Sequence, residues 1–173
     1  QALRNQRKPL IVMSPKSLLR HKDAASPMED LANGEFKRVI GEVDQLDAKK
    51  VKRVILCCGK VYYDLVNARR EKKITDIAIV RLEQLYPFPK DSLEAELAKY
   101  PKATEIVWCQ EEPRNQGAWY WIASRHHLDS QISGKQKMLL VSRPASSSPA
   151  VGYLAKHNEQ LKALIESAMG KIE

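Results

Sequence analysis

Five short apolar runs, rich in Val, Ile and Leu, recur along the chain at intervals of a few tens of residues. They are Leu10–Met13, Val54–Cys58, Ile77–Val80, Ile106–Cys109 and Met138–Val141. None of them alternates apolar with polar residues. Continuous apolar runs are typical of strands that are covered on both faces, as in a parallel sheet between two layers of helices. The pattern therefore predicts a mostly parallel five-stranded sheet.

Segments with helical spacing lie between these runs. A short helix is expected through Ser17–Arg20, where Ser14-Pro15 offers an N-cap followed by proline in the first turn. The further expected helices are Val61–Lys72, Asp91–Tyr100, Trp119–Leu128 and His157–Ile172. Alternating strands and helices predict a three-layer α/β fold. We expect residues 1–173 to form a single domain, with an irregular insertion at about 22–53 that packs over one edge of the sheet.

Composition and charge narrow the function classes. The chain has 173 residues, 43% hydrophobic and 29% charged, which is ordinary for a globular domain. No apolar run approaches the roughly 20 residues of a membrane span, so we expect no membrane partner. The net charge is +8, and residues 1–22 carry basic residues without a single acid. Such a patch attracts nucleotide phosphates, an acidic protein face or nucleic acid. Modules that bind nucleic acid usually have aromatic residues between their basic ones, and this segment has none, so we expect no nucleic-acid partner.

Cysteine usage and glycine motifs give no sign of a catalytic or metal site. Cys57, Cys58 and Cys109 form no Cys-x-x-Cys pair, which favours buried apolar residues in a reducing compartment. The two common phosphate-binding motifs, Gly-x-Gly-x-x-Gly and Gly-x-x-x-x-Gly-Lys-Ser/Thr, do not occur in the sequence. We therefore predict no catalytic residue and no metal ligand. The chain begins with Gln1 rather than Met, which indicates a fragment or a processed product.

Polar residues gather in one stretch, Gln110 to Trp119, directly after the fourth apolar run. We expect a loop at the carboxyl edge of the sheet, where α/β proteins usually bind ligands and partners. Adjacent residues of an extended chain point in opposite directions, so Glu111 and Glu112 are expected in structural or interface roles rather than as a catalytic pair. Asn115 is expected to cap the next helix, and Gly117 permits close backbone approach.

Three cations follow other apolar runs and are also expected at this edge. Lys60 stands at the head of a helix, where an anion can bind, although an ordinary strand-to-helix turn is favoured. Arg81 and Arg143 stand at two strand exits. Two arginines on one edge can bind an anionic ligand, or they can equally bind Glu111 or Glu112. The sequence leaves both possibilities open.

Five ordered motifs together resemble a known family. They are Lys8–His21 (KPLIVMSPKSLLRH), Gly59–Leu65 (GKVYYDL), Ile79–Pro89 (IVRLEQLYPFP), Gln110–Trp119 (QEEPRNQGAW) and Arg143–Ser146 (RPAS). In these residues the chain resembles the C-terminal domain of the thiamine-diphosphate-dependent decarboxylating component of 2-oxoglutarate dehydrogenase. The resemblance extends over nearly the whole chain and implies a transketolase C-terminal-domain-like fold.

The resemblance implies that this chain completes a larger enzyme of the tricarboxylic acid cycle. The parent would be a homodimer that decarboxylates 2-oxoglutarate and passes the succinyl group to the dihydrolipoyl succinyltransferase component. Thiamine diphosphate and Mg²⁺ would be held by the preceding domains, because this chain lacks their Gly-Asp-Gly…Asn pattern. The isolated chain is therefore predicted to be inactive. The compartment would be the bacterial cytoplasm, which we prefer, or the mitochondrial matrix.

Some relatives of this family carry an allosteric site for a CoA-type or adenine nucleotide effector in this domain. The resemblance makes Arg4, Arg7, Lys60, Arg81 and Gln110 the candidates here. We assign to an interface or structural loop the residues Glu111, Glu112, Asn115, Gly117, Trp119 and Arg143. Two alternatives stay open, a freestanding nucleotide- or CoA-binding module and the same domain of a 2-oxoadipate dehydrogenase.

Overall fold

The computed structural model describes residues 5–124 and 138–170. The chain divides into two compact units, Gln1–Glu35 and Phe36–Glu173. The expectation that residues 1–173 form one domain therefore stays a prediction. Within the described residues, no helix combines the length and the apolar character that crossing a membrane requires.

The first unit contains short helical turns and no described strand. It holds the 3-10 helices η1 (Lys16–Arg20) and η2 (Lys22–Ala24) and the α-helix α1 (Met28–Asn33). Pro15 precedes η1, and no side chain caps it, so the expected Ser14 cap does not form. The prediction of a strand at Leu10–Met13 is wrong. An apolar run becomes a strand only beside a partner, and here Ile11 is 83% exposed in extended chain.

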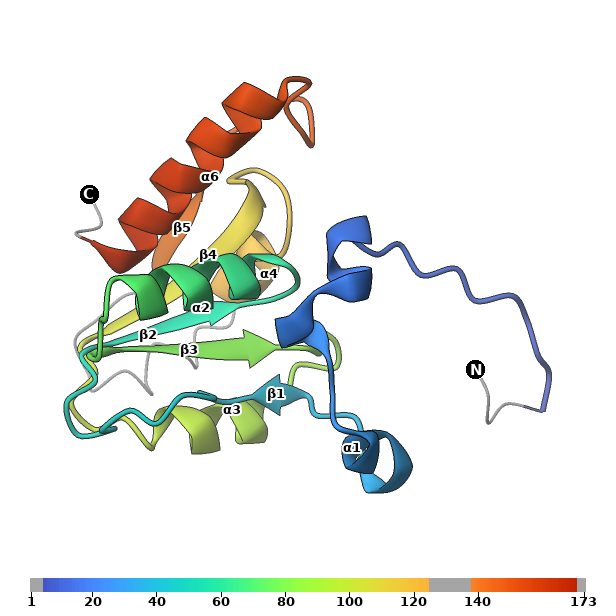
Figure 1. Ribbon diagram of the computed structural model, residues 1–173, viewed down its shortest axis with the longest axis horizontal. Helices are drawn as coiled ribbons and strands as arrows, with labels where there is room; N and C mark the ends of the chain where they lie inside the picture. The colour runs from blue at the N-terminus through green and yellow to red at the C-terminus, as the bar shows by residue number, and fades with distance from the viewer. Residues whose placement is uncertain (1–4, 125–137, 171–173) are drawn as a thin grey trace. The chain divides into compact units, whose positions relative to one another are not determined.

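The second unit is built on a five-stranded sheet with the order β1-β3-β2-β4-β5 (Figure 1). Its strands are β1 (Val39–Ile40), β2 (Arg53–Cys57), β3 (Ile77–Leu82), β4 (Glu105–Pro113) and β5 (Leu139–Arg143). The last four are parallel to one another, and β1 is antiparallel to β3. The predicted α/β class with a mostly parallel five-stranded sheet is confirmed. The fifth strand, however, comes from the expected insertion at 22–53 and not from Leu10–Met13.

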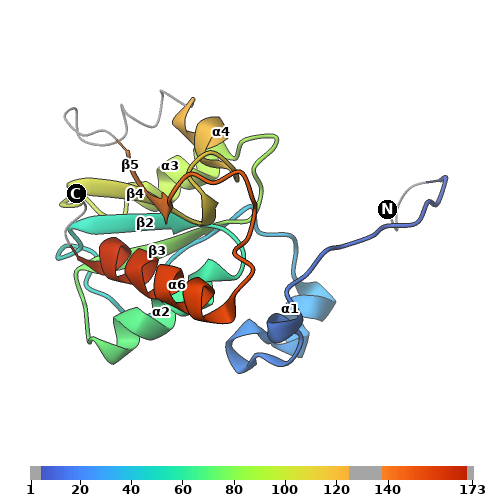
Figure 2. The ribbon, with the colours of Figure 1, turned by 90° about the horizontal axis from the view of Figure 1, so that it is seen from above.

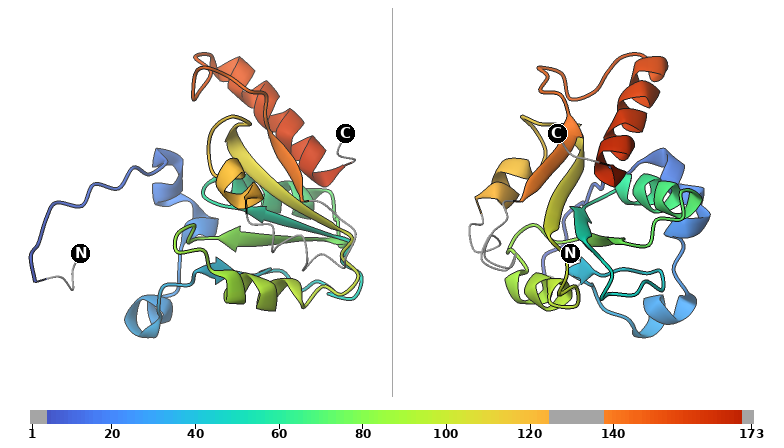
Figure 3. Two further views of the ribbon diagram at one scale, coloured as in Figure 1. Left: turned by 180° about the vertical axis from the view of Figure 1, so that it is seen from behind. Right: turned by 90° about the vertical axis from the view of Figure 1, so that its left-hand side faces the viewer.

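Helices cover both faces of this sheet (Figure 2). On one face lie α2 (Val61–Glu71) and α6 (Leu154–Met169), and on the other lie α3 (Lys90–Leu97) and α4 (Trp119–Ala123). The views in Figure 3 show the sheet between the two layers. The predicted helices in this unit are confirmed, with ends shifted by up to three residues for α2, α3 and the start of α6. The helix α4 is shorter than predicted, because it ends at Ala123 with Ser124 as its C-cap, and the rest of its predicted range, 125–128, lies outside the described residues.

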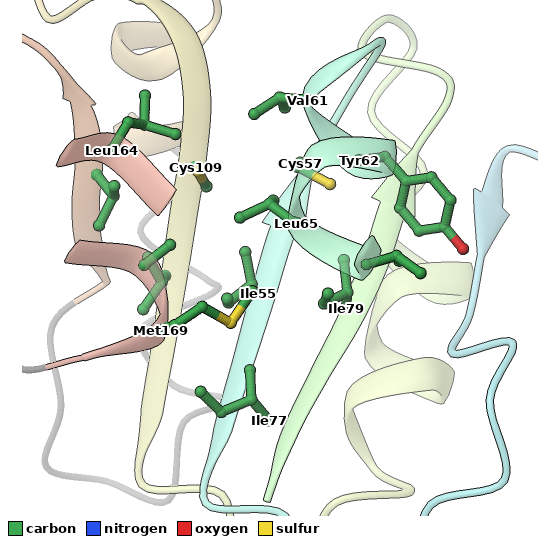
Figure 4. Packing of buried hydrophobic residues seen from close by; sticks show 14 residues of the cluster. Ile55, Cys57, Val61, Tyr62, Leu65, Ile77, Ile79, Cys109, Leu164 and Met169 are labelled. Atoms are coloured by element: carbon green, nitrogen blue, oxygen red, sulfur yellow. The ribbon is translucent and has the colours of Figure 1, made fainter. Parts of the chain in front are cut away.

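The hydrophobic core has two parts because the central strands are buried on both faces. On β2, Val54 and Leu56 pack toward α3 and α4, whereas Ile55 and Cys57 pack toward α2 and α6. Figure 4 shows the second part, where side chains of α2 and α6 lie over β2 and β4. This two-sided burial explains why the apolar runs do not alternate with polar residues.

A buried ionic network anchors the segment that follows β1. Arg69, on α2, binds the Glu42 carboxylate with both terminal nitrogens and donates to Asp44 Oδ2 at 2.7 Å. Glu42 Oε2 also accepts the backbone N–H of Ile79 at 2.8 Å. Arg70 binds Asp44 from the outer side of the helix. The irregular segment is thereby fixed to α2 and to β3.

Strand β4 runs further than the apolar pattern predicts. Gln110, Glu111 and Glu112 belong to this strand, which ends at Pro113, so the prediction that a loop begins at Gln110 is wrong. Pairing with β5 keeps the polar segment extended, and the register shifts between Cys109 and Pro113. Two adjacent carboxylates therefore project from a strand, on opposite faces of the sheet.

Candidate functional site

Charged side chains meet at the carboxyl edge of the sheet, on the face covered by α2 and α6. Arg81, Glu111 and Arg143 continue the alternation that points Ile79, Cys109 and Val141 into the α2–α6 side of the core. Lys60 joins them from the turn between β2 and α2, where Gly59 has φ +71°. We call Lys60, Arg81, Glu111 and Arg143 the charged edge.

Glu111 links two cations of the charged edge. Its carboxylate lies 3.6 Å from Lys60 Nζ and 3.4 Å from Arg143 Nη2. Lys60 also donates to Asp64 at 2.8 Å. Burial by itself lowers the pKa of Lys60, but the hydrogen bond to Asp64 and the charges of Asp64 and Glu111 outweigh it, and the pKa is raised. Lys60 is therefore a permanent cation at this edge.

Arg143 is almost fully enclosed by protein. Its side chain is 6% exposed, and its Nη2 lies 3.1 Å from His157 Nδ1 on α6 as well as close to Glu111. Its Nε has no hydrogen-bond partner. Of the two possibilities that the sequence left open for Arg143, the structure shows the pair with Glu111. This ion pair joins β5 to β4.

Arg81 has different surroundings. Its guanidinium carbon lies 4.3 Å from the centre of the Tyr62 ring, and Nη1 donates to the Tyr63 hydroxyl at 3.4 Å. Its nearest carboxylate is Glu83, at 3.6 Å, and not Glu111 or Glu112. Its Nε lacks a hydrogen-bond partner. Two tyrosines and Glu83 thus hold the guanidinium in place.

Gln110 lies on the opposite face of the sheet and is 1% exposed. Its Oε1 accepts Trp108 Nε1 at 2.9 Å and the backbone N–H of Trp119 at 3.0 Å. Its Nε2 donates to the carbonyl oxygens of Pro113 and Gln116 at 3.1 and 2.7 Å. Both ends of the amide are used to fold the turn between β4 and α4. The structure therefore separates Gln110 from Lys60 and Arg81.

The turn after β4 is organised differently from its predicted form. Asn115 does not cap α4 but exchanges two hydrogen bonds with the backbone of Ser146, at 2.9 and 3.0 Å. Gln110 accepts the N–H at the start of α4 instead. Gly117 has φ +67°, and a Cβ there would lie 3.0 Å from the Gln110 side chain and from Glu112 Cβ. Only glycine fits this position without strain.

The remaining candidates lie elsewhere. Arg4 is outside the described residues, and Arg7 is exposed in the first unit. The five candidate effector residues therefore do not form one described cluster, and Lys60 and Arg81 are the two at the charged edge.

The structure also shows an apolar pocket that the motifs did not predict. It lies at the same edge on the α4 face and is lined by Cys58, Leu85, Tyr86, Glu112, Gly117, Ala118 and Trp121. Its residues come from the turns after β2 and β3, from the end of β4, and from α4 with the turn before it, and no local spacing connects these segments. The signals available in the sequence were the aromatic residues Tyr86 and Trp121, because aromatic side chains are enriched where proteins bind partners.

The comparisons with known proteins decide the family. Residues 25–169 match the family described as "2-oxoglutarate dehydrogenase C-terminal". The chain belongs to this family.

Bacterial members of this family match the chain end to end. The 2-oxoglutarate dehydrogenase E1 component of Cupriavidus necator is 59% identical over 173 residues. That of Haemophilus influenzae is 54% identical over 98% of the chain, and that of Azotobacter vinelandii is 52% identical over 97%. The chain spans 18% of the length of each of these relatives.

A solved structure titled "Split gene transketolase, inactive beta4 tetramer" aligns with 70% of the chain and with 39% of its own chain. The TM-score is 0.47 and the sequence identity is 15%. The fold class given above rests on the sheet topology and not on this alignment.

Among the described residues, no three His, Cys, Asp or Glu side chains come together as metal ligands. Burial raises the pKa of Cys58 to about 11 and that of Cys109 to about 12, so both thiols stay protonated at neutral pH.

Proposed function

We propose that the chain is the C-terminal assembly and regulatory domain of a succinyl-transferring 2-oxoglutarate dehydrogenase E1 component. The observation that carries this proposal is the end-to-end match, at 59% identity, to 18% of such a protein. The charged edge supports it, because its cations are held by structural contacts with Glu111, Glu83 and the tyrosines rather than arranged around a reacting group.

In this proposal the chemistry belongs to the rest of the enzyme. The preceding domains and the second subunit of a homodimer would hold thiamine diphosphate and Mg²⁺, and the product would pass to the dihydrolipoyl succinyltransferase component. The compartment would be the bacterial cytoplasm. The purified chain, supplied with 2-oxoglutarate, thiamine diphosphate and Mg²⁺, should release no CO₂ above a protein-free control. Measurable turnover by the pure chain would refute the assignment of catalysis to other domains.

We further propose that Lys60 and Arg81 bind an anionic effector of the CoA or adenine nucleotide type. Arg81 is 20% exposed and its guanidinium is held in position by Tyr62 and Tyr63, which favours an anion that approaches its exposed side. Lys60 stands where α2 begins, so the helix dipole adds to its charge. Gln110 has no part in this proposal, because its amide is enclosed on the other face.

Calorimetric titration with acetyl-CoA tests the effector site. We expect Arg81→Ala to weaken binding at least tenfold, because one charge-assisted contact to phosphate is worth about 1.5–3 kcal/mol. Lys102→Ala is the matched control, since it removes one exposed cation near the start of β4, at the opposite edge of the sheet. Equal binding by the native chain and Arg81→Ala would remove Arg81 from the site.

A further inference from the structure

The apolar pocket beside α4 combines three features that suit one kind of ligand. Its volume is about 400 Å³, toward the lower end of the range of small-ligand sites. It lies on the face of the sheet opposite the charged edge, because Glu112 and Glu111 point in opposite directions along β4. It is therefore independent of the proposed effector site.

The first feature is an aromatic wall in a fixed position. The rings of Tyr86 and Trp121 lie 5.8 Å apart with an interplanar angle of 60°. Trp121 Nε1 donates to the Leu85 carbonyl at 2.9 Å, which orients the indole. Tyr86 is 78% exposed, so a ligand can reach its ring. Aromatic faces carry negative charge density and attract cations.

The second feature is a carboxylate without a cation. Glu112 is exposed at the rim of the pocket and forms no ion pair with any residue in the described parts of the chain. The third is an apolar lining, to which Leu85 and Ala118 contribute. Burial raises the pKa of the Cys58 thiol in the same lining, and the charges of Glu112 and Glu83 raise it further.

We propose that this pocket binds an arginine side chain presented by another protein, with the guanidinium over the Tyr86 ring and its N–H groups donating to Glu112. Arginine suits the site better than lysine does. Its guanidinium is planar and weakly hydrated, it stacks on aromatic rings, and it can donate two parallel hydrogen bonds to one carboxylate. The apolar walls given by Leu85 and Ala118 fit the methylene stem.

Nuclear magnetic resonance of the ¹⁵N-labelled 173-residue chain tests this proposal. The probe is the tripeptide acetyl-Gly-Arg-Gly-amide, for which we expect a dissociation constant of roughly 1 mM. The amide peak of Gly117 and the indole peak of Trp121 should shift with the titration, because both residues line the pocket. The indole peak of Trp108, which is buried in the core, should not move.

The controls separate charge from shape. The same tripeptide with citrulline keeps the shape of arginine but is neutral, and it should cause no shift. Glu112→Gln should weaken arginine binding about tenfold, whereas Glu71→Gln, an equal change on an exposed carboxylate of α2, should leave it unchanged. Tyr86→Ala should weaken it about threefold.

Three results would overturn the proposal. The first is the absence of any shift at Gly117 and Trp121, and the second is an equal response to citrulline, which would indicate an apolar pocket only. The third is equal binding of the lysine tripeptide, which would reject recognition of the guanidinium. Circular dichroism of each variant verifies that a loss of binding is not a loss of folding.

Discussion

Replacing Arg69 by Met tests the buried ionic network that anchors the segment after β1. Arg69 is 1% exposed and is the cation that Glu42 binds, and the Glu42 side chain is only 7% exposed. Methionine keeps an unbranched apolar side chain but leaves the Glu42 carboxylate buried without its cation. Breaking a buried pair from one side costs about 3–5 kcal/mol of unfolding free energy. We expect a loss in this range for Arg69→Met.

A second substitution separates the charge from the packing. Glu42→Gln keeps an acceptor for the backbone N–H of Ile79 but removes the charge. The double variant Glu42→Gln/Arg69→Met should therefore be more stable than Arg69→Met alone, by about 1–2 kcal/mol. Such a gain would show that most of the stability lost in Arg69→Met comes from the buried Glu42 carboxylate that is left without a cation.

Urea unfolding at pH 7, followed by far-ultraviolet circular dichroism, measures these differences. Arg70→Met is the matched control, because Arg70 contacts Asp44 in the same network but its side chain is 45% exposed. Exposed ion pairs contribute up to about 1 kcal/mol, so this variant should lose no more than that. If Arg69→Met and Arg70→Met lose equal stability, the argument that a buried network anchors this segment is refuted.

Three further predictions concern residues of the second unit. The hydrogen bond from Arg70 lowers the pKa of Asp44 from 3.8 to about 2. Asp44→Asn should therefore lower the free energy of unfolding by about 2 kcal/mol above pH 4, and this loss should disappear as the pH falls to 2. A loss that does not change with pH in urea unfolding would contradict this. Gln110→Leu leaves the buried Trp108 Nε1 without its acceptor and should lose about 2–4 kcal/mol by the same assay. Gly117→Ala forces a side chain to φ +67° against Gln110 and should lose about 1–3 kcal/mol, and an unchanged urea midpoint would refute the strain.

The central strands could be predicted from the sequence because burial on both faces leaves a continuous apolar run. Val54–Cys58 and Ile77–Val80 have no polar interruption, and in the structure they lie in β2, which ends one residue earlier at Cys57, and in β3. Leu10–Met13 has the same apolar composition but no partner strand in the structure, so a strand predicted from composition alone was wrong there. Val39–Ile40 was missed because two residues of an edge strand give no pattern, although a β-branched pair before glycine is a weak signal.

The candidate site was predicted only in part, for a related reason. Arg143 and Glu111 were placed at one edge because both follow apolar runs, but the sequence left open whether Arg143 binds Glu111, Glu112 or an anionic ligand. The separation of Gln110 from Arg81 could not be predicted, since it depends on β4 continuing in the extended state through polar residues. Asn115 binds Ser146, which is 31 residues away in sequence, and Glu42 binds Arg69, which is 27 residues away. A pattern of nearby residues cannot predict contacts over such distances.

The brevity of β1 has a consequence for the chain in concentrated solution. An apolar strand such as β3, left at the rim of a sheet, would offer its free amides and carbonyls to any passing extended peptide and so template fibrils. Val39 and Ile40 occupy part of that rim in antiparallel register, opposite Leu82 and Arg81. The Arg38 carbonyl also accepts the N–H groups of Glu83 and Gln84, and the Glu42 carboxylate accepts that of Ile79. These donors of the rim are therefore already occupied and are not offered to a further strand.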